Sequence, residues 1–133
     1  MKPSEILRAA QALIASPETW TQGAYARDRA GNSVSFDAPE AVCFCAMAAI
    51  RKVRAPFLSM AMRNAQRAYG GVVSQVTVPV QEGMSAPHYL RRAIYAGGAH
   101  PLDDITDWQD HHTHPEVLAA FDAAIALAEA DGQ

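Results

Sequence analysis

The sequence contains little cysteine and no long apolar segment, and both features restrict where the protein can act. Cys43 and Cys45 are its only cysteines; on a helix, side chains two positions apart point in different directions and cannot form a disulfide with each other. No segment approaches the roughly 18 apolar residues of a membrane span, and the first residues lack the apolar core of a secretion signal. We therefore expect a cytoplasmic protein with reduced cysteines and no membrane association.

Two long segments each carry charges of almost only one sign, and the sign differs between them. Residues 41–102 contain seven basic residues and a single acid, Glu82, whereas residues 103–133 contain eight acids and no Lys or Arg. The two segments either attract each other within the fold or form charged faces for a partner, including a second copy of the chain. The net charge of −3 does not indicate an overall basic nucleic-acid binder. Nucleic-acid binding therefore ranks below protein binding, and its candidate contacts are Arg51, Lys52, Arg54, Arg63 and Arg67.

The apolar run at residues 41–50 predicts the centre of the fold. Ten consecutive apolar residues, rich in alanine, indicate a helix that is buried nearly all round rather than a strand. Asp37 and Glu40 have the spacing of a capping box at its start, and Arg54 followed by Pro56 marks its end. We expect a central helix over residues 38–54, against which the last helix packs through Phe121 and its apolar neighbours.

Apolar periodicity predicts the remaining helices. They begin at residues 4, 57, 85 and 113, and the last of them starts with a capping box formed by Thr113 and Glu116. A turn-rich cluster predicts a small hairpin at residues 25–36. Together these features predict a single, mainly α domain over residues 1–133: a compact bundle of four or five helices around the buried central helix, with a small β-hairpin or edge strand.

Two further segments have weaker patterns. Residues 72–80 alternate like an edge strand or an extended connection. Residues 100–112 form an acidic, histidine-rich segment that we interpret as a loop before the last helix.

Two blocks of the sequence resemble a known family. The first contains Trp20 and Gln22-Gly23 and continues in Cys45-Ala46 and Ala49-Ile50; the second contains Trp108 and Asp110 ahead of the last helix. They resemble a family of short, mostly helical bacterial and phage proteins catalogued only as a domain of unknown function. Its pattern has glycine where this chain has Ala48 and asparagine where it has Gln109. The resemblance implies a helical fold and no particular chemistry.

A cysteine nucleophile with a histidine base is the enzymatic alternative. Such a pair would make the protein a small hydrolase or transferase, with Cys43 or Cys45 as nucleophile, His112 or His114 as base, and Gln109 or Asp110 orienting the imidazole. The sequence has no glycine-rich phosphate loop, no Gly-x-Ser-x-Gly motif and no local signature of a cysteine protease. Free cysteine in an alanine-rich segment is ordinarily a small apolar core residue. We therefore expect no catalytic residues.

A metal site is the second alternative to a simple structural role. Histidines next to carboxylates are typical zinc ligands, and the candidates are His100, His111 and His112. The cluster lacks the paired histidines of a helical zinc motif, and neighbouring histidines do not easily face one point. We expect a polar surface loop, without metal or other cofactor.

Tryptophan and tyrosine beside polar residues predict a binding surface. Aromatic rings with a polar edge are common at protein interfaces, and the residues concerned are Trp20, Gln22, Tyr25, Trp108, Gln109 and Asp110. The alternative is that the tryptophans fill the ends of the helical bundle. The resulting hypothesis is a non-enzymatic protein-interaction module, phage-derived and binding a host or defence protein.

Overall fold

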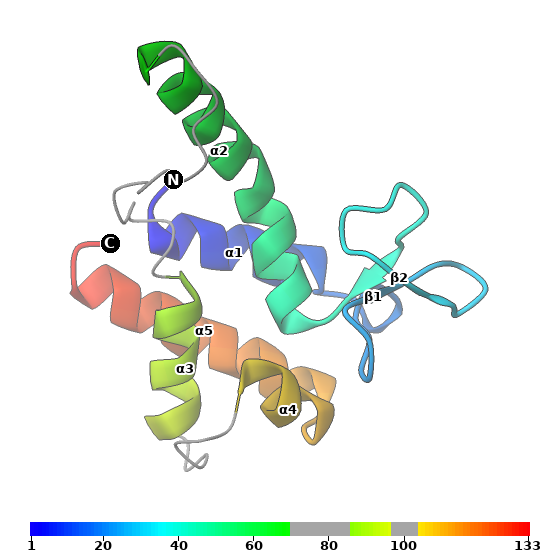
Figure 1. The fold of residues 1–133 in the computed structure, drawn as a ribbon. Coiled ribbons are helices and arrows are strands. Elements are labelled where there is room, and N and C mark those ends of the chain that lie inside the picture. The colour runs from blue at the N-terminus through cyan, green and yellow to red at the C-terminus, as the bar shows by residue number, and fades with distance from the viewer. Residues whose placement is uncertain (70–85, 97–103) are drawn as a thin grey trace.

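The chain folds into five α-helices and a small antiparallel sheet (Figure 1). The computed structural model describes residues 1–69, 86–96 and 104–133. Within these ranges the helices are α1 (Pro3–Leu13), α2 (Ala46–Tyr69), α3 (Ala86–Ala96), α4 (Ile105–Asp110) and α5 (His114–Ala130). A single 3-10 turn, η1 (Pro17–Thr19), follows α1. The prediction of a mainly α fold with a small β element is confirmed.

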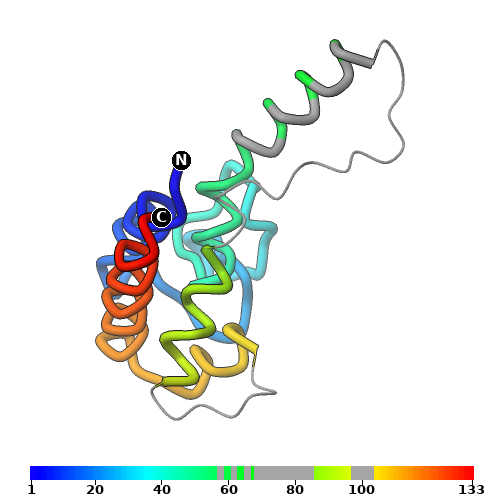
Figure 2. The backbone as a smooth tube through the Cα atoms, turned by 90° about the vertical axis from the view of Figure 1, so that its left-hand side faces the viewer, coloured from blue at the N-terminus to red at the C-terminus, as the bar shows by residue number. Residues whose placement is uncertain are grey.

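The first and last helices pack against each other. They lie side by side in Figure 2, and α1 packs against both α2 and α5 while α3 packs against α5. Leu7 of α1, Leu90 of α3 and Phe121 of α5 are all almost completely buried in this core. The predicted packing of the last helix on the central helix is therefore wrong, because α5 packs mainly against α1 and α3. The apolar residues of the last helix indicated that it packs against another element, but they did not indicate that α1 supplies the facing surface.

The start of α5 follows its sequence pattern. Thr113 Oγ1 accepts a hydrogen bond from the Glu116 amide at 3.4 Å, and Glu116 Oε1 accepts one from the Thr113 amide at 2.9 Å. These two bonds are the reciprocal pair of a capping box. The bonds from Thr113 also hold the pKa of the Glu116 carboxyl below its usual value. The predicted capping box is confirmed.

The apolar run that was expected to be entirely helical is divided between a strand and a helix. Strand β3 (Cys43–Phe44) pairs with strand β1 (Ala26–Arg27), and α2 begins only at Ala46. The backbone amides around β3 are hydrogen-bonded to β1 and the residue before it. The Val42 amide donates to the Arg27 carbonyl at 2.9 Å, and the Cys45 amide donates to the Tyr25 carbonyl at 2.9 Å. The prediction of a helix over residues 38–54 is therefore wrong at its start.

The predicted end of the central helix is also wrong. Helix α2 passes through Pro56 and continues to Tyr69, so the two helices expected on either side of Pro56 are one. Pro56 is exposed. On the exposed side of a helix, water can replace the hydrogen bond that proline removes, so a proline there bends or weakens a helix without always ending it.

The predicted hairpin is present as part of a three-stranded sheet. Strands β1 (Ala26–Arg27) and β2 (Ser33–Val34) are antiparallel, and the strand order is β2-β1-β3. Asp28 Oδ1 accepts hydrogen bonds from the Ala30 and Asn32 amides at 3.0 and 2.9 Å, and Gly31 has a positive φ of 85°. The turn is thus closed by a carboxylate and by a glycine that tolerates this conformation.

Helix α4 occupies residues 105–110 of the segment 100–112, which was predicted to be a loop. Asp104 Oδ1 accepts a hydrogen bond from the Ile105 amide at 2.7 Å, and Ile105 and Gln109, four residues apart, are buried on one face. The acidic residues of this segment concealed the helical spacing of its buried residues. Residues 72–80, with their expected edge strand, lie outside the described residues, as does His100.

None of the helices in the described ranges is both long enough and apolar enough to cross a membrane.

Candidate functional site

Gln109 lies at the point where α4, the start of α2 and the segment after η1 meet. Its side chain is 0% exposed. Gln109 Oε1 accepts hydrogen bonds from Trp20 Nε1 at 2.8 Å and from the Ala46 amide at 3.1 Å. Its Nε2 donates to the Thr21 carbonyl at 3.1 Å and to Asp110 Oδ1 at 2.7 Å. An amide side chain has two acceptor positions and two donors, so Gln109 is fully hydrogen-bonded inside the protein.

Two further polar residues reinforce this connection. Gln22 Nε2 donates to the carbonyls of Gln109 and His112 at 2.9 and 2.8 Å. Asp110 Oδ1 also accepts from the Gly23 amide at 3.1 Å. We call this set, formed by Trp20, Gln22, Gln109 and Asp110, the Gln109 junction. Four of the six predicted binding residues thus lie together, and they bond mainly to one another and to the backbone.

The other two predicted binding residues lie elsewhere. Tyr25 is 44% exposed, and the Arg51 guanidinium lies 5.2 Å from the centre of its ring. Trp108 is half-buried and stacks on His112, with ring centres 4.2 Å apart and planes 20° apart. His112 Nδ1 lies 2.6 Å from the Trp108 carbonyl oxygen, which fixes the ring in this position.

Trp108 and His112 form one wall of an apolar groove between α3, α4 and α5. The groove encloses about 320 Å³, and Ala93 and Ile94 of α3 line its other wall. Its floor is α5, where the small side chains of Ala119, Ala120 and Ala123 leave space. We call this feature the Trp108 groove.

The surroundings of the Trp108 groove are acidic. Glu116 lines the groove itself. Asp107 lines an adjoining recess of about 510 Å³ that shares Trp108 and His112 with the groove. Both carboxylates are exposed, and no Lys or Arg is among the described residues that line either hollow.

The cysteine candidates have structural positions. Cys45 directly precedes α2 and is 0% exposed, and its Sγ accepts a hydrogen bond from the Ala48 amide at 3.4 Å. Burial raises the pKa of the Cys45 thiol, which disfavours the reactive thiolate. Cys43 is half-buried in β3, with its Sγ 3.8 Å from the Arg27 carbonyl oxygen.

The histidine candidates after α4 and at the start of α5 are hydrogen-bonded to backbone oxygens rather than to a thiol. His114 Nε2 lies 2.6 Å from the Ile14 carbonyl oxygen, and its ring is 5.1 Å from that of Trp20. His111 Nδ1 lies 2.7 Å from the Asp107 carbonyl oxygen. In the part of the chain that the structure describes, no group of three His, Cys, Asp or Glu side chains is placed to hold a metal ion.

The floor of the Trp108 groove was missed by sequence reasoning. Sequence reasoning gave no role to Ala119 and Ala123, which lie on the exposed side of α5. Their spacing of four residues places them on one helix face. Two small residues at this spacing, on the helix that follows Trp108, were the sequence signal that could have indicated the groove.

Comparison with known proteins gives a family but no characterised relative. Residues 1–127 match the sequence model described as Family of unknown function (DUF6197). Neither the curated proteins nor the solved structures provide a match to this chain.

Proposed function

The chain belongs to this family of unknown function, as its two sequence blocks predicted, and we propose from its geometry that it is a non-enzymatic protein-binding module. In this proposal the Trp108 groove receives a segment of a partner protein. The segment carries an apolar side chain that enters the groove and basic residues beside it. A phage origin, and a host or defence protein as the partner, remain part of the hypothesis.

The observation that carries the proposal is the half-buried Trp108 beside a floor of small residues. Tryptophan is among the residues that contribute most to protein interfaces, especially where it borders a pocket that a partner can fill. Ala119 and Ala123 leave room for such an anchor without rearrangement of α5. A small apolar groove with an aromatic wall suits one inserted side chain.

The charge around the groove supports the choice of a basic partner segment. Asp107 and Glu116 are both exposed and close to Trp108. Complementary charge speeds association and selects among partners more than it adds affinity. A cytoplasmic location is part of the proposal, and it is supported by the two free thiols at Cys43 and Cys45.

Selection of peptides from a random displayed library, with the purified chain as bait, tests the proposal. We expect enriched peptides to combine an aromatic or large aliphatic residue with nearby Lys or Arg. In fluorescence anisotropy titrations of a selected peptide, Trp108→Ala and Ala123→Arg should each weaken binding by about tenfold or more, as expected when an anchor pocket is lost or filled.

The matched control is Ala30→Arg, which adds the same side chain at an exposed position in the turn between β1 and β2. It should leave the affinity unchanged. Because Ala123 is exposed, its variant should fold like the parent, which circular dichroism would verify. No enrichment, or selected peptides that bind the Trp108 and Ala123 variants as tightly as the parent, would contradict the proposal.

A further inference from the structure

The first half of α2 carries three cations, and the described residues include no acidic partner for any of them. The ion pairs within the described ranges join Arg8 to Glu129, Arg91 to Asp104 and Arg92 to Asp131. The α2 cations are Arg51, Lys52 and Arg54. Lys52 is engaged in another way, since its Nζ donates to the Phe36 carbonyl at 3.4 Å and lies 5.3 Å from the centre of the Phe44 ring.

The two arginines share a recess. It has a volume of about 310 Å³ and is lined by Phe36, Arg51, Arg54 and Ala55. Residues three apart on a helix are neighbours on its surface, so the two arginine side chains lie on the same side of α2. The Tyr25 ring lies under Arg51 and supports its side chain, while the Lys52 bond holds the backbone at Phe36.

Among the residues that the structure describes, no carboxylate forms an ion pair with either arginine of this recess. Arg54 is half-buried, and the pKa of its guanidinium is lowered first by burial and then by the nearby charge of Arg51. Two neighbouring cations that repel each other, and that have no carboxylate partner within the described ranges, are favourably placed to accept an anion.

We propose that the recess formed by Phe36, Arg51, Arg54 and Ala55 binds a phosphate dianion. A phosphate monoester has a charge of about −1.5 to −2 at neutral pH, which balances both guanidiniums, whereas a carboxylate balances one. Arginine also presents its N–H groups in a planar fork that matches phosphate oxygens. The Phe36 ring and Ala55 provide an apolar wall for an organic group attached to the phosphate. The dianion can thus be free phosphate or part of a small monoester.

The arrangement of the other α2 cations favours a single phosphate over a nucleic-acid backbone. Arg63 and Arg67 are exposed on the same helix. At roughly 100° per residue, they lie about 120° and 160° around the helix axis from Arg51. The cations therefore do not form one continuous row, which a chain of phosphates would need. This site is separate from the Trp108 groove, so either proposal can fail without the other.

Titrations monitored by NMR of the arginine side-chain Nε–H signals test the site. We expect saturable shifts of the Arg51 and Arg54 signals with inorganic phosphate and with phenyl phosphate. Chloride at the same ionic strength should not produce them. Arg54→Gln should weaken binding by about tenfold, the loss expected for one charge-assisted contact. Arg51→Gln, at an exposed position, repeats the test if the half-buried Arg54 variant does not fold.

Arg63→Gln is the matched control, because it removes an exposed arginine from the same helix outside the recess. It should leave the affinity within about twofold of the parent. Tighter binding of phenyl phosphate than of inorganic phosphate would identify a monoester as the ligand, and equal binding would identify free phosphate. Shifts that grow linearly with any salt, or an equal loss in Arg63→Gln, would overturn the assignment.

Discussion

Gln109 joins three segments that are far apart in the sequence. Its amide bonds to the indole of Trp20, to the carbonyl of Thr21 and to the first amide of α2 at Ala46. It therefore positions the start of α2 in place of the aspartate that the sequence indicated. Asp37, the expected cap, instead accepts a hydrogen bond from the Ser35 hydroxyl in an exposed turn.

Replacing Gln109 by leucine tests whether the junction stabilises the fold. The variant leaves Trp20 Nε1, the Ala46 amide and the Thr21 carbonyl without their partner. Each buried group left unsatisfied costs about 1–3 kcal/mol, so we expect the free energy of unfolding to fall by about 3–5 kcal/mol. Urea denaturation, followed by circular dichroism, measures the change.

The control for this prediction is Gln11→Leu. Gln11 also bonds through its Nε2 to two acceptors, the Leu118 carbonyl at 3.1 Å and Asp122 Oδ1 at 2.7 Å, but it is only half-buried and Asp122 is exposed. Water can solvate the groups that it leaves, so its loss should be about 1 kcal/mol or less. Equal losses of unfolding free energy in the two variants would show that the burial of Gln109 adds nothing to the stability of the fold.

Among the elements, those with local signals were predictable. The capping box of α5 and the turn residues of the β1–β2 hairpin act on neighbours a few residues away, so the sequence alone revealed them. The start of α2 was not predictable in this way. Residues 43–44 form a strand because the hairpin offers a partner about 16 residues earlier in the chain, as in the pairing of Cys43 with Arg27.

The candidate site was predictable in its residue types but not in its arrangement. Trp20, Gln22, Gln109 and Asp110 were identified from their chemistry, and the structure brings them together. Their hydrogen bonds to one another depend on α4, which the sequence pattern concealed. The groove beside Trp108 depends on how α3 packs against α5, and no local pattern encodes that contact.

Phe121→Ala tests the packing of α5. Phe121 is 0% exposed, and its removal leaves a cavity where α5 faces α1 and α3. We expect a loss of about 3–5 kcal/mol in the free energy of unfolding, as is typical of buried phenylalanine. Denaturant unfolding of the purified variant gives the value.

Leu118→Ala provides the comparison, because Leu118 lies on the same helix but is only half-buried. It should cost clearly less than Phe121→Ala, because its truncated side chain was already partly in water. His111→Ala, at an exposed position, should cost less than about 0.5 kcal/mol. A loss for Phe121→Ala as small as that for His111→Ala would refute the core described for α5.

Across the whole molecule, the uneven charge of the sequence is used partly within the fold. Arg91 pairs with Asp104 at 3.7 Å and Arg92 with Asp131 at 3.2 Å, so the basic middle and the acidic end meet through α3. In the described part of the chain no cation of α2 forms an ion pair with the acidic end, and the main neighbours of α5 are α1 and α3. The charge counts predicted an attraction between the two segments, but they did not predict which cations would form ion pairs.

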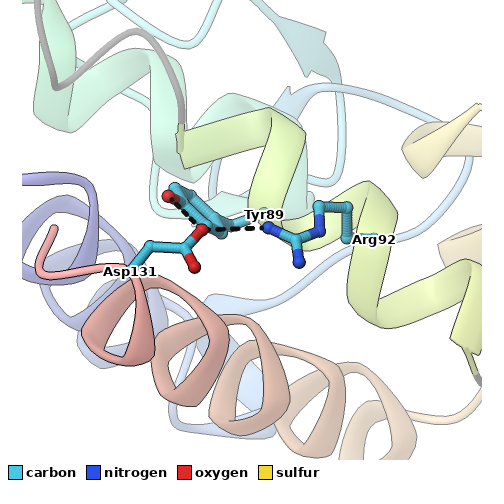
Figure 3. A network of polar contacts seen from close by, with 3 residues as sticks. All are labelled: Tyr89, Arg92 and Asp131. Carbon is cyan, nitrogen blue, oxygen red and sulfur yellow. Dashed lines mark hydrogen bonds and ion pairs between the residues drawn. The ribbon is translucent and has the colours of Figure 1, made fainter.

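The end of α5 is held to α3 by a small polar network (Figure 3). Asp131 Oδ2 accepts hydrogen bonds from the Tyr89 hydroxyl at 2.9 Å and from Arg92 Nη1 at 3.2 Å, and the Arg92 guanidinium lies 5.5 Å from the centre of the Tyr89 ring. The bond from Tyr89, followed by that from Arg92, lowers the pKa of Asp131. Burial, followed by the bond to Asp131, raises the pKa of Tyr89.

These opposite shifts predict how the network contributes to stability as the pH changes. The pKa of Asp131 is lower in the folded protein, so its contribution is present above its ordinary value of 3.8 and is lost as the pH falls through the folded value. The pKa of Tyr89 is higher in the folded protein, so its contribution is present below its ordinary value of 10.0 and is lost as the pH rises through the folded value. The network should therefore stabilise the fold most between about pH 5 and pH 9.

Thermal unfolding of the parent and of Asp131→Asn across the pH range measures this contribution. The parent should have the higher melting temperature near neutral pH. The difference should shrink as the pH falls below about 4 toward the lowered pKa of Asp131, and as it rises above about 10 toward the raised pKa of Tyr89, beyond which the ionised phenol would repel the carboxylate. Glu129→Gln is the control, since it removes a carboxylate from the same turn that pairs with Arg8 instead. Its difference from the parent should not shrink at alkaline pH, because no tyrosine is among its described partners. A difference for Asp131→Asn that stayed the same from acid to alkaline pH would show that Asp131 and Tyr89 do not act together in the folded protein.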